Sequence, residues 1–131
     1  MYKSLKSDFP ILQKKIRNNN ITYLDTASTS QKPKSVIESI TNFYQNSYEN
    51  VHRGMNSLSI DATEIFEASR EKIKNFINAK SSNEIIFTKN ATEGTNIIAH
   101  AMSSLLNDGD EIITTELEHH SNFLPWLSLC K

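Results

Sequence analysis

The spacing of hydrophobic residues predicts a chain built mainly from helices. Apolar residues recur every three or four positions in three stretches, residues 33–44, 60–78 and 90–105. Pro33 suits the first turn of the first of these helices. A short last helix is expected near the end of the chain, where Ser121 could cap it. Each long stretch therefore predicts an amphipathic helix with one face to bury.

Two short segments between these helices predict strands. Residues 84–88 and 111–115 are rich in β-forming side chains, and Gly109 lies in a turn before the second segment. The order strand, helix, strand fits a right-handed crossover in a mostly parallel sheet. Such a sheet buries both faces and needs more than two strands. The residues alone thus indicate part of a larger α/β domain.

Composition excludes several classes of protein. The 131 residues are 37% hydrophobic and 22% charged, with a net charge of −1, so there is no basic stripe for binding nucleic acid. No apolar run reaches the length of about 18 residues that a membrane span needs. Cys130 is the single cysteine, which excludes an intrachain disulfide and disfavours a cysteine-based metal site. The composition favours a cytoplasmic protein.

Residues 90–94 form the first candidate site, because they join the predicted strand to the next helix. Unpaired backbone N–H groups and the helix dipole favour an anion at such a junction. Thr92 adds a hydroxyl donor, and Gly94 would let a ligand approach the backbone. The alternative is that Thr92 merely caps the helix. The segment is short and is not a P-loop, so both interpretations stay open.

Two further loops carry ring and charged side chains. His119 and His120 follow the second predicted strand, where open α/β sheets bind ligands, and an imidazole there could stack on a flat cofactor. Adjacent histidines in an extended segment point opposite ways, which argues against a shared metal ion. His52 and Arg53 precede Gly54, and the guanidinium suits a carboxylate or phosphate. Solvated histidines and an arginine paired with a surface acid are the alternatives.

Taken together, these segments resemble one family. They occur in a characteristic order and spacing: Tyr23-Leu24-Asp25-Thr26-Ala27, Gln31-Lys32-Pro33, Val51-His52-Arg53-Gly54, Thr92-Glu93-Gly94-Thr95-Asn96, Glu118-His119-His120-Ser121-Asn122 and Pro125-Trp126. The pattern resembles the N-terminal part of the SufS/CsdA-type cysteine desulfurases, which belong to the class V aminotransferases. The likeness covers nearly the whole chain.

The resemblance implies a fold and an activity. The fold is the large domain of fold type I enzymes dependent on pyridoxal 5'-phosphate (PLP), ending after its second strand. Residues 1–20 are then expected to form an arm or helix, and residues 21–131 the first portion of the large domain. Cysteine desulfurases are homodimers that convert L-cysteine to L-alanine. Their persulfide sulfur passes to iron–sulfur cluster assembly, through an acceptor of the SufE type; many also act on selenocysteine.

The resemblance also implies roles for single residues. Ala91 and Thr92 would hold the cofactor phosphate, although family members often have Gly-Thr-Thr where this chain has Asn90-Ala91-Thr92. His119 would stack on the pyridine ring and assist proton transfers. On the substrate side, Ala27 would lie beside the substrate, and His52 and Arg53 would line the mouth of the active site.

The family's catalytic lysine, persulfide cysteine and other reacting residues have no counterpart in this chain, so the resemblance implies that the chain is inactive alone. PLP chemistry needs that lysine and an acid paired with the ring nitrogen. Two alternatives stay open. The chain could belong to another class V enzyme, or it could be a small α/β binding module that has lost catalysis.

Overall fold

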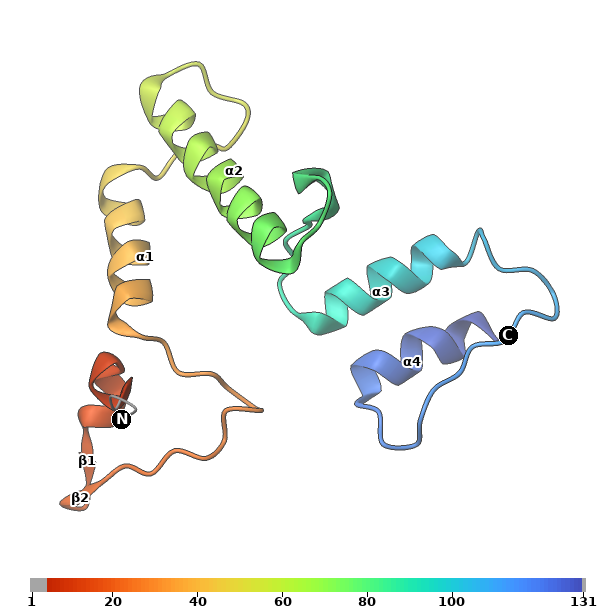
Figure 1. The fold of residues 1–131 in the computed structure, drawn as a ribbon, viewed down its shortest axis with the longest axis horizontal. Helices are drawn as coiled ribbons and strands as arrows, with labels where there is room; N and C mark the ends of the chain where they lie inside the picture. Colours follow the sequence, from red (N-terminus) through yellow and green to blue (C-terminus); the bar gives the residue numbers. More distant parts are fainter. Residues whose placement is uncertain (1–4, 131) are drawn as a thin grey trace. The chain divides into compact units, whose positions relative to one another are not determined.

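The structure is a computed structural model, and it describes residues 5–130. It divides into two compact units, the first extending to Ile73 and the second beginning at Lys74. Figure 1 follows the elements along the chain. In order they are η1 (Leu5–Asp8), η2 (Pro10–Gln13), β1 (Lys15–Ile16), β2 (Asn19–Asn20), α1 (Lys34–Asn46), α2 (Ser57–Ile77), η3 (Ser82–Glu84), α3 (Ala91–Met102) and α4 (His120–Leu129).

The first described residues form two short 3-10 turns and a hairpin. Pro10 begins η2, since its ring suits a first turn and cannot continue a preceding helix. β1 and β2 pair in antiparallel fashion, with Lys15 opposite Asn20. Arg17 and Asn18 make the turn between them with φ of 49° and 64°. Residues 5–20 therefore form short turns and a hairpin, with no α-helix.

The four α-helices confirm the helices predicted from the sequence. α1 begins directly after Pro33, which is its N-cap. α2 begins at Ser57, three residues before the predicted start, because the Asn56 side chain accepts a hydrogen bond from the Ser59 amide at 2.9 Å. The cap of α4 differs from the prediction, since His119 and not Ser121 caps this helix.

Ser59 fixes the loop that precedes α2. Its side chain is fully buried, accepts a hydrogen bond from the Gly54 amide at 3.0 Å and donates one to the carbonyl of Asn50. Gly54 lies so close that a Cβ built on it would be 2.3 Å from the Ser59 Oγ. The glycine is therefore required by this close approach, and the loop between residues 50 and 54 is held against the start of α2.

The two predicted strands do not form paired strands in the structure. Residues 85–88 and 111–115 are extended or irregular, and β1 with β2 makes the one sheet among residues 5–130. Ile85 has φ of −97° and ψ of 113°, which is an extended conformation. A strand is stabilised by pairing with a neighbouring strand, and β1 with β2 is the one such pair among residues 5–130. The predicted parallel sheet is thus not observed here.

Several large apolar side chains lie exposed on these elements. Phe76 on α2 is 90% exposed, and Ile113 in the second predicted strand is 95% exposed. The buried residues among those described are few and mostly small: Ser59, Ala62, Ile85, Ala99 and Pro125. The apolar stripes of the helices are therefore largely uncovered. Among residues 5–130, no helix has the length and apolar character that would let it cross a membrane.

We expect the Gly54→Ala variant to lose stability. The new methyl group would collide with Ser59, whose side chain is buried and held by two hydrogen bonds. Overpacking of this kind costs about 1–3 kcal/mol in the free energy of unfolding. Urea unfolding followed by circular dichroism measures it.

The matched control is Gly94→Ala. A Cβ at Gly94 meets its nearest atom, the Thr88 Oγ1, at an ordinary 3.6 Å. Alanine inside a helix is more stable than glycine by about 0.5–1 kcal/mol, so this variant should gain stability. Equal effects of the two substitutions would contradict the role given to Gly54.

Candidate functional site

The N-terminus of α3 presents unused hydrogen-bond donors. The Asn90 side chain accepts from the Glu93 amide at 2.9 Å, and the Glu93 carboxylate accepts from the Lys89 amide at 2.6 Å. The first turn of a helix has no internal acceptors for its N–H groups. The amides of Ala91 and Thr92 consequently have no acceptor among the described residues. Asn90, and not Thr92, is the cap, which leaves the Thr92 hydroxyl available to a ligand.

The N-terminus of α4 is built around a histidine. His119 is the N-cap, and its ring Nδ1 accepts a hydrogen bond from the Ser121 amide at 3.1 Å. The Ser121 Oγ lies 2.8 Å from the same nitrogen. His120, one residue on, is exposed, and its ring centroid is 6.5 Å from that of His119. Both histidines are exposed, and His119 is in addition held in place as the cap of α4.

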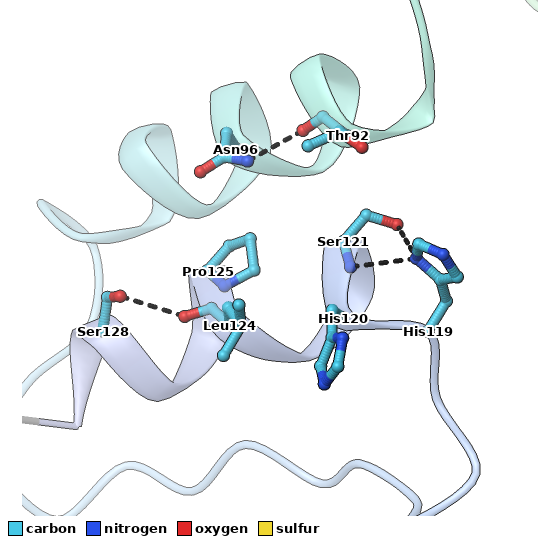
Figure 2. A pocket seen from close by; sticks show the side chains of 8 residues that line it. All are labelled: Thr92, Asn96, His119, His120, Ser121, Leu124, Pro125 and Ser128. Carbon is cyan, nitrogen blue, oxygen red and sulfur yellow. Dashed lines mark hydrogen bonds between the residues drawn. The ribbon is translucent and has the colours of Figure 1, made fainter.

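These two helix ends line one cavity in the second unit. α3 and α4 pack against each other, and a cavity of about 410 Å³ lies between them. Figure 2 shows Thr92 and Asn96 on the α3 side, facing residues of α4. From the α4 side come His119, His120, Ser121, Leu124, Pro125 and Ser128. The structure thus brings together Thr92 and His119, which stand 27 positions apart in the sequence.

The residues that line this cavity suit a flat, phosphorylated ligand. Its phosphate would meet the Thr92 hydroxyl and the N–H groups that begin α3, where the helix dipole is positive. Its ring would meet the imidazole of His119. PLP has both parts, so the residues present fit this cofactor. Among the described residues, no cluster of three or more His, Cys, Asp or Glu side chains could hold a metal ion.

His52 is held by contacts with α2 in the first unit. Its backbone is left-handed, with φ of 68°, and its amide donates to the Thr63 Oγ1 at 2.9 Å. Its Nε2 lies 2.8 Å from the Glu67 Oε1, and its ring meets Phe66 edge-on. Three contacts with α2, at Thr63, Phe66 and Glu67, therefore define where His52 lies.

Glu67 links His52 to Arg70, whose guanidinium lies 3.1 Å from the Glu67 carboxylate. The hydrogen bond from His52 is the main cause that lowers the pKa of Glu67 below its ordinary value of 4.5, and Arg70 lowers the pKa further. Arg53 is exposed and forms no ion pair with a described residue. Pairing of Arg53 with a surface acid is therefore not observed.

Ala27 lies in a turn of the first unit. The Tyr23 hydroxyl lies 3.0 Å from the carbonyl oxygen of Asp25 and is also hydrogen-bonded to that of Thr29. The Thr29 amide donates to the Asp25 carbonyl at 3.1 Å and closes the turn. Ala27 is exposed at its tip. These hydrogen bonds therefore fix the backbone of the turn that carries Ala27.

A model of the class-V aminotransferases matches residues 22–131 of the chain. The chain belongs to the class-V aminotransferase family. A probable cysteine desulfurase of Synechocystis is 49% identical over 94% of the chain, and a cysteine desulfurase of Serratia proteamaculans is 45% identical over 97%. The apo cysteine desulfurase of Thermococcus onnurineus matches 96% of the chain with a TM-score of 0.84 and 39% identity.

The resemblance noted from the sequence motifs is thereby confirmed. Class-V aminotransferases and cysteine desulfurases use PLP, the cofactor that the α3–α4 cavity fits. The chain spans 30% of the Synechocystis relative, 32% of the Serratia relative and 30% of the Thermococcus structure. This class-V segment is thus a part of the fold type I architecture of its relatives.

The sequence pattern did not predict the roles of three site residues. Asn90 resembles any polar residue before a helix, and Glu67 lies 15 positions from its partner His52. Ser121 was expected to cap α4 through its side chain, whereas its amide is the donor that His119 accepts. The spacing Asn90-x-x-Glu93 is a capping signal and could have identified the α3 cap.

We expect the pKa of Glu67 to rise toward 4.5 when His52 is replaced by alanine, because the largest cause of the lowered pKa is removed. The folded-state pKa lies below the unfolded value. Glu67 therefore contributes stability that is present above pH 4.5 and is lost as the pH falls through the lowered pKa. NMR titration of the Glu67 side-chain carboxyl carbon measures this pKa in the unmodified chain and in the His52→Ala variant.

The Arg70→Ala variant is the companion measurement, and it should also raise the pKa of Glu67. An unchanged titration of Glu67 in the His52→Ala chain would contradict the pairing of His52 with this carboxylate.

Proposed function

We propose that this chain is part of a PLP-dependent cysteine desulfurase, which converts L-cysteine to L-alanine and keeps the sulfur as an enzyme persulfide. One observation carries the proposal: Thr92, in the first turn of α3, and His119, the cap of α4, line the same cavity. The names of the relatives, at 45–49% identity, favour desulfurase over other class-V activities.

In this proposal, Ala91 and Thr92 bind the cofactor phosphate. Their amides and the Thr92 hydroxyl supply three donors, and the α3 dipole adds a positive end. The Glu93 carboxylate already accepts a hydrogen bond from the Lys89 amide, and we expect it to keep this partner when the phosphate binds. The phosphate therefore meets donors and not a competing carboxylate.

His119 then supports the ring of the cofactor. The bound group supplies an electron sink for the carbon next to the substrate amine. The imidazole, fixed as the N-cap of α4, stacks against the ring, excludes water from that face and is placed to move a proton. Because the cap fixes the ring of His119, the stacking surface needs no rearrangement when the cofactor enters.

We further propose that Arg53, His52 and Ala27 contact the substrate, as the family resemblance implies. Arg53 is free to pair with the substrate carboxylate, and His52 is held in place by Glu67. Ala27 presents a small side chain at a turn that a substrate can approach. Within this proposal, residues 1–20, of which 1–4 lie outside the described residues, belong to an N-terminal arm, and residues 21–131 belong to the PLP-binding domain.

Further parts of the enzyme are proposed to correspond to the sequence of the relatives outside the segment that matches this chain. These parts are additional strands, the lysine that binds the cofactor and the cysteine that carries sulfur. The strands would pair with residues 84–88 and 111–115 in a mostly parallel sheet and cover apolar side chains such as Ile113. The complete enzyme would work as a cytoplasmic homodimer that passes sulfur to a SufE-type acceptor for iron–sulfur cluster assembly.

We expect the Thr92→Val variant to bind PLP roughly tenfold more weakly, because a hydrogen bond to a charged phosphate is lost. Trp126 is the single tryptophan and lies on α4, so quenching of its fluorescence reports binding near the cavity. The matched control is Thr95→Val, because the Thr95 hydroxyl is already used by the Ala91 carbonyl at 2.9 Å. Equal affinities of the two variants would contradict the phosphate site.

We also expect the 131-residue chain to release no alanine from L-cysteine in the presence of PLP, because the chain does not supply the reacting lysine and cysteine. Chromatographic detection of alanine checks this. Release of alanine at a rate above that of free PLP would contradict the assignment of those groups to further sequence. An in-frame Ser-Gly-His-Lys segment in the gene after Lys131 would support it, and a continuation without such a lysine would favour a non-catalytic module.

A further inference from the structure

The contact between Ser121 and His119 determines which ring nitrogen carries a proton. The Ser121 amide is the second N–H of α4 and has no acceptor inside the helix. It donates to the His119 Nδ1 at 3.1 Å. A backbone amide can only donate, so Nδ1 must offer its lone pair. A neutral imidazole carries one proton, which is therefore on Nε2.

The Ser121 hydroxyl reinforces this arrangement. Its Oγ lies 2.8 Å from the same Nδ1, and it can donate its proton there. Figure 2 shows the amide and the hydroxyl of Ser121 converging on one nitrogen of the ring. The His119 Nε2 makes no hydrogen bond with a described residue. One edge of the imidazole is thus fixed by α4, and the other edge is left for a ligand.

We propose that Ser121 is a positioning residue that holds His119 as the Nε2–H tautomer at the edge of the α3–α4 cavity. The amide selects the tautomer, and the hydroxyl restricts rotation of the ring. Rotation would break both contacts and leave the first turn of α4 without its cap.

The Nε2–H tautomer of His119 has a chemical consequence, which rests on the proposed function. If His119 meets a cofactor ring, it arrives with a hydrogen-bond donor at Nε2 and its acceptor nitrogen already used. His119 in its neutral form would therefore first donate a proton or a hydrogen bond to the bound group. It would act as a base only after Nε2 had given up its proton.

NMR of the chain labelled with ¹⁵N tests the proposal in the absence of any cofactor, at a pH at which the imidazoles are neutral. We expect the Nδ1 and Nε2 shifts of His119 to be separated as in a single tautomer, and further apart than those of His120. His120 is the internal reference, because it is exposed and its ring makes no hydrogen bond with a described residue. We also expect a scalar coupling between the Ser121 amide nitrogen and the His119 Nδ1.

Two variants separate the contributions of Ser121. Ser121→Pro removes the amide proton and the hydroxyl in the first turn, where proline is tolerated, and the shift separation of His119 should fall to that of His120. Ser121→Ala removes the hydroxyl alone, so the separation and the coupling should persist. An unchanged separation in the Ser121→Pro chain would overturn the proposal.

The coupling in the unmodified chain keeps the test decisive if the proline variant fails to fold. Absence of this coupling, or tautomer averaging of His119 equal to that of His120, would overturn the proposal. Because no cofactor is present, either result is independent of the PLP-binding measurement, so this inference and the proposed function can fail separately.

Discussion

The backbone N–H groups that begin each helix are the constraint on which the site depends, because every helix starts with donors that find no acceptor inside it. In α2 and α3, Asn56 and Asn90 supply side-chain oxygens for these donors. In α4, the acceptor is the ring nitrogen of His119. What remains unpaired, at Ala91 and Thr92, is the part of the chain suited to an anion. Capping residues and a bound anion thus both supply acceptors for the N–H groups that begin a helix.

The helices and the family could be predicted from the sequence because both depend on local patterns. Helical spacing placed the long helices to within a few residues of their observed starts, as at Ser57. The order of the motifs around Thr92 and His119 identified the class-V family. The caps were harder to predict. Asn90, Ser121 and Thr92 are all polar residues near a helix start, and the choice among them depends on backbone geometry that spacing does not determine.

The state of the two predicted strand segments and the contacts of His52 could not be predicted, because both depend on partners far away in the sequence. Residues 84–88 have the composition of a strand, but a strand forms by pairing with another strand, and within residues 5–130 only β1 and β2 pair. Glu67 meets His52 because the loop before α2 folds back onto that helix, held by Ser59.

The central claim is that the start of α3 and His119 together form a cofactor site. A crystal structure of the chain grown with pyridoxal phosphate tests this claim most directly. The account predicts the phosphate within hydrogen-bond distance of the Ala91 and Thr92 amides and the pyridine ring stacked on the imidazole of His119. A phosphate bound away from the α3 N-terminus, or a ring that does not contact His119, would contradict it.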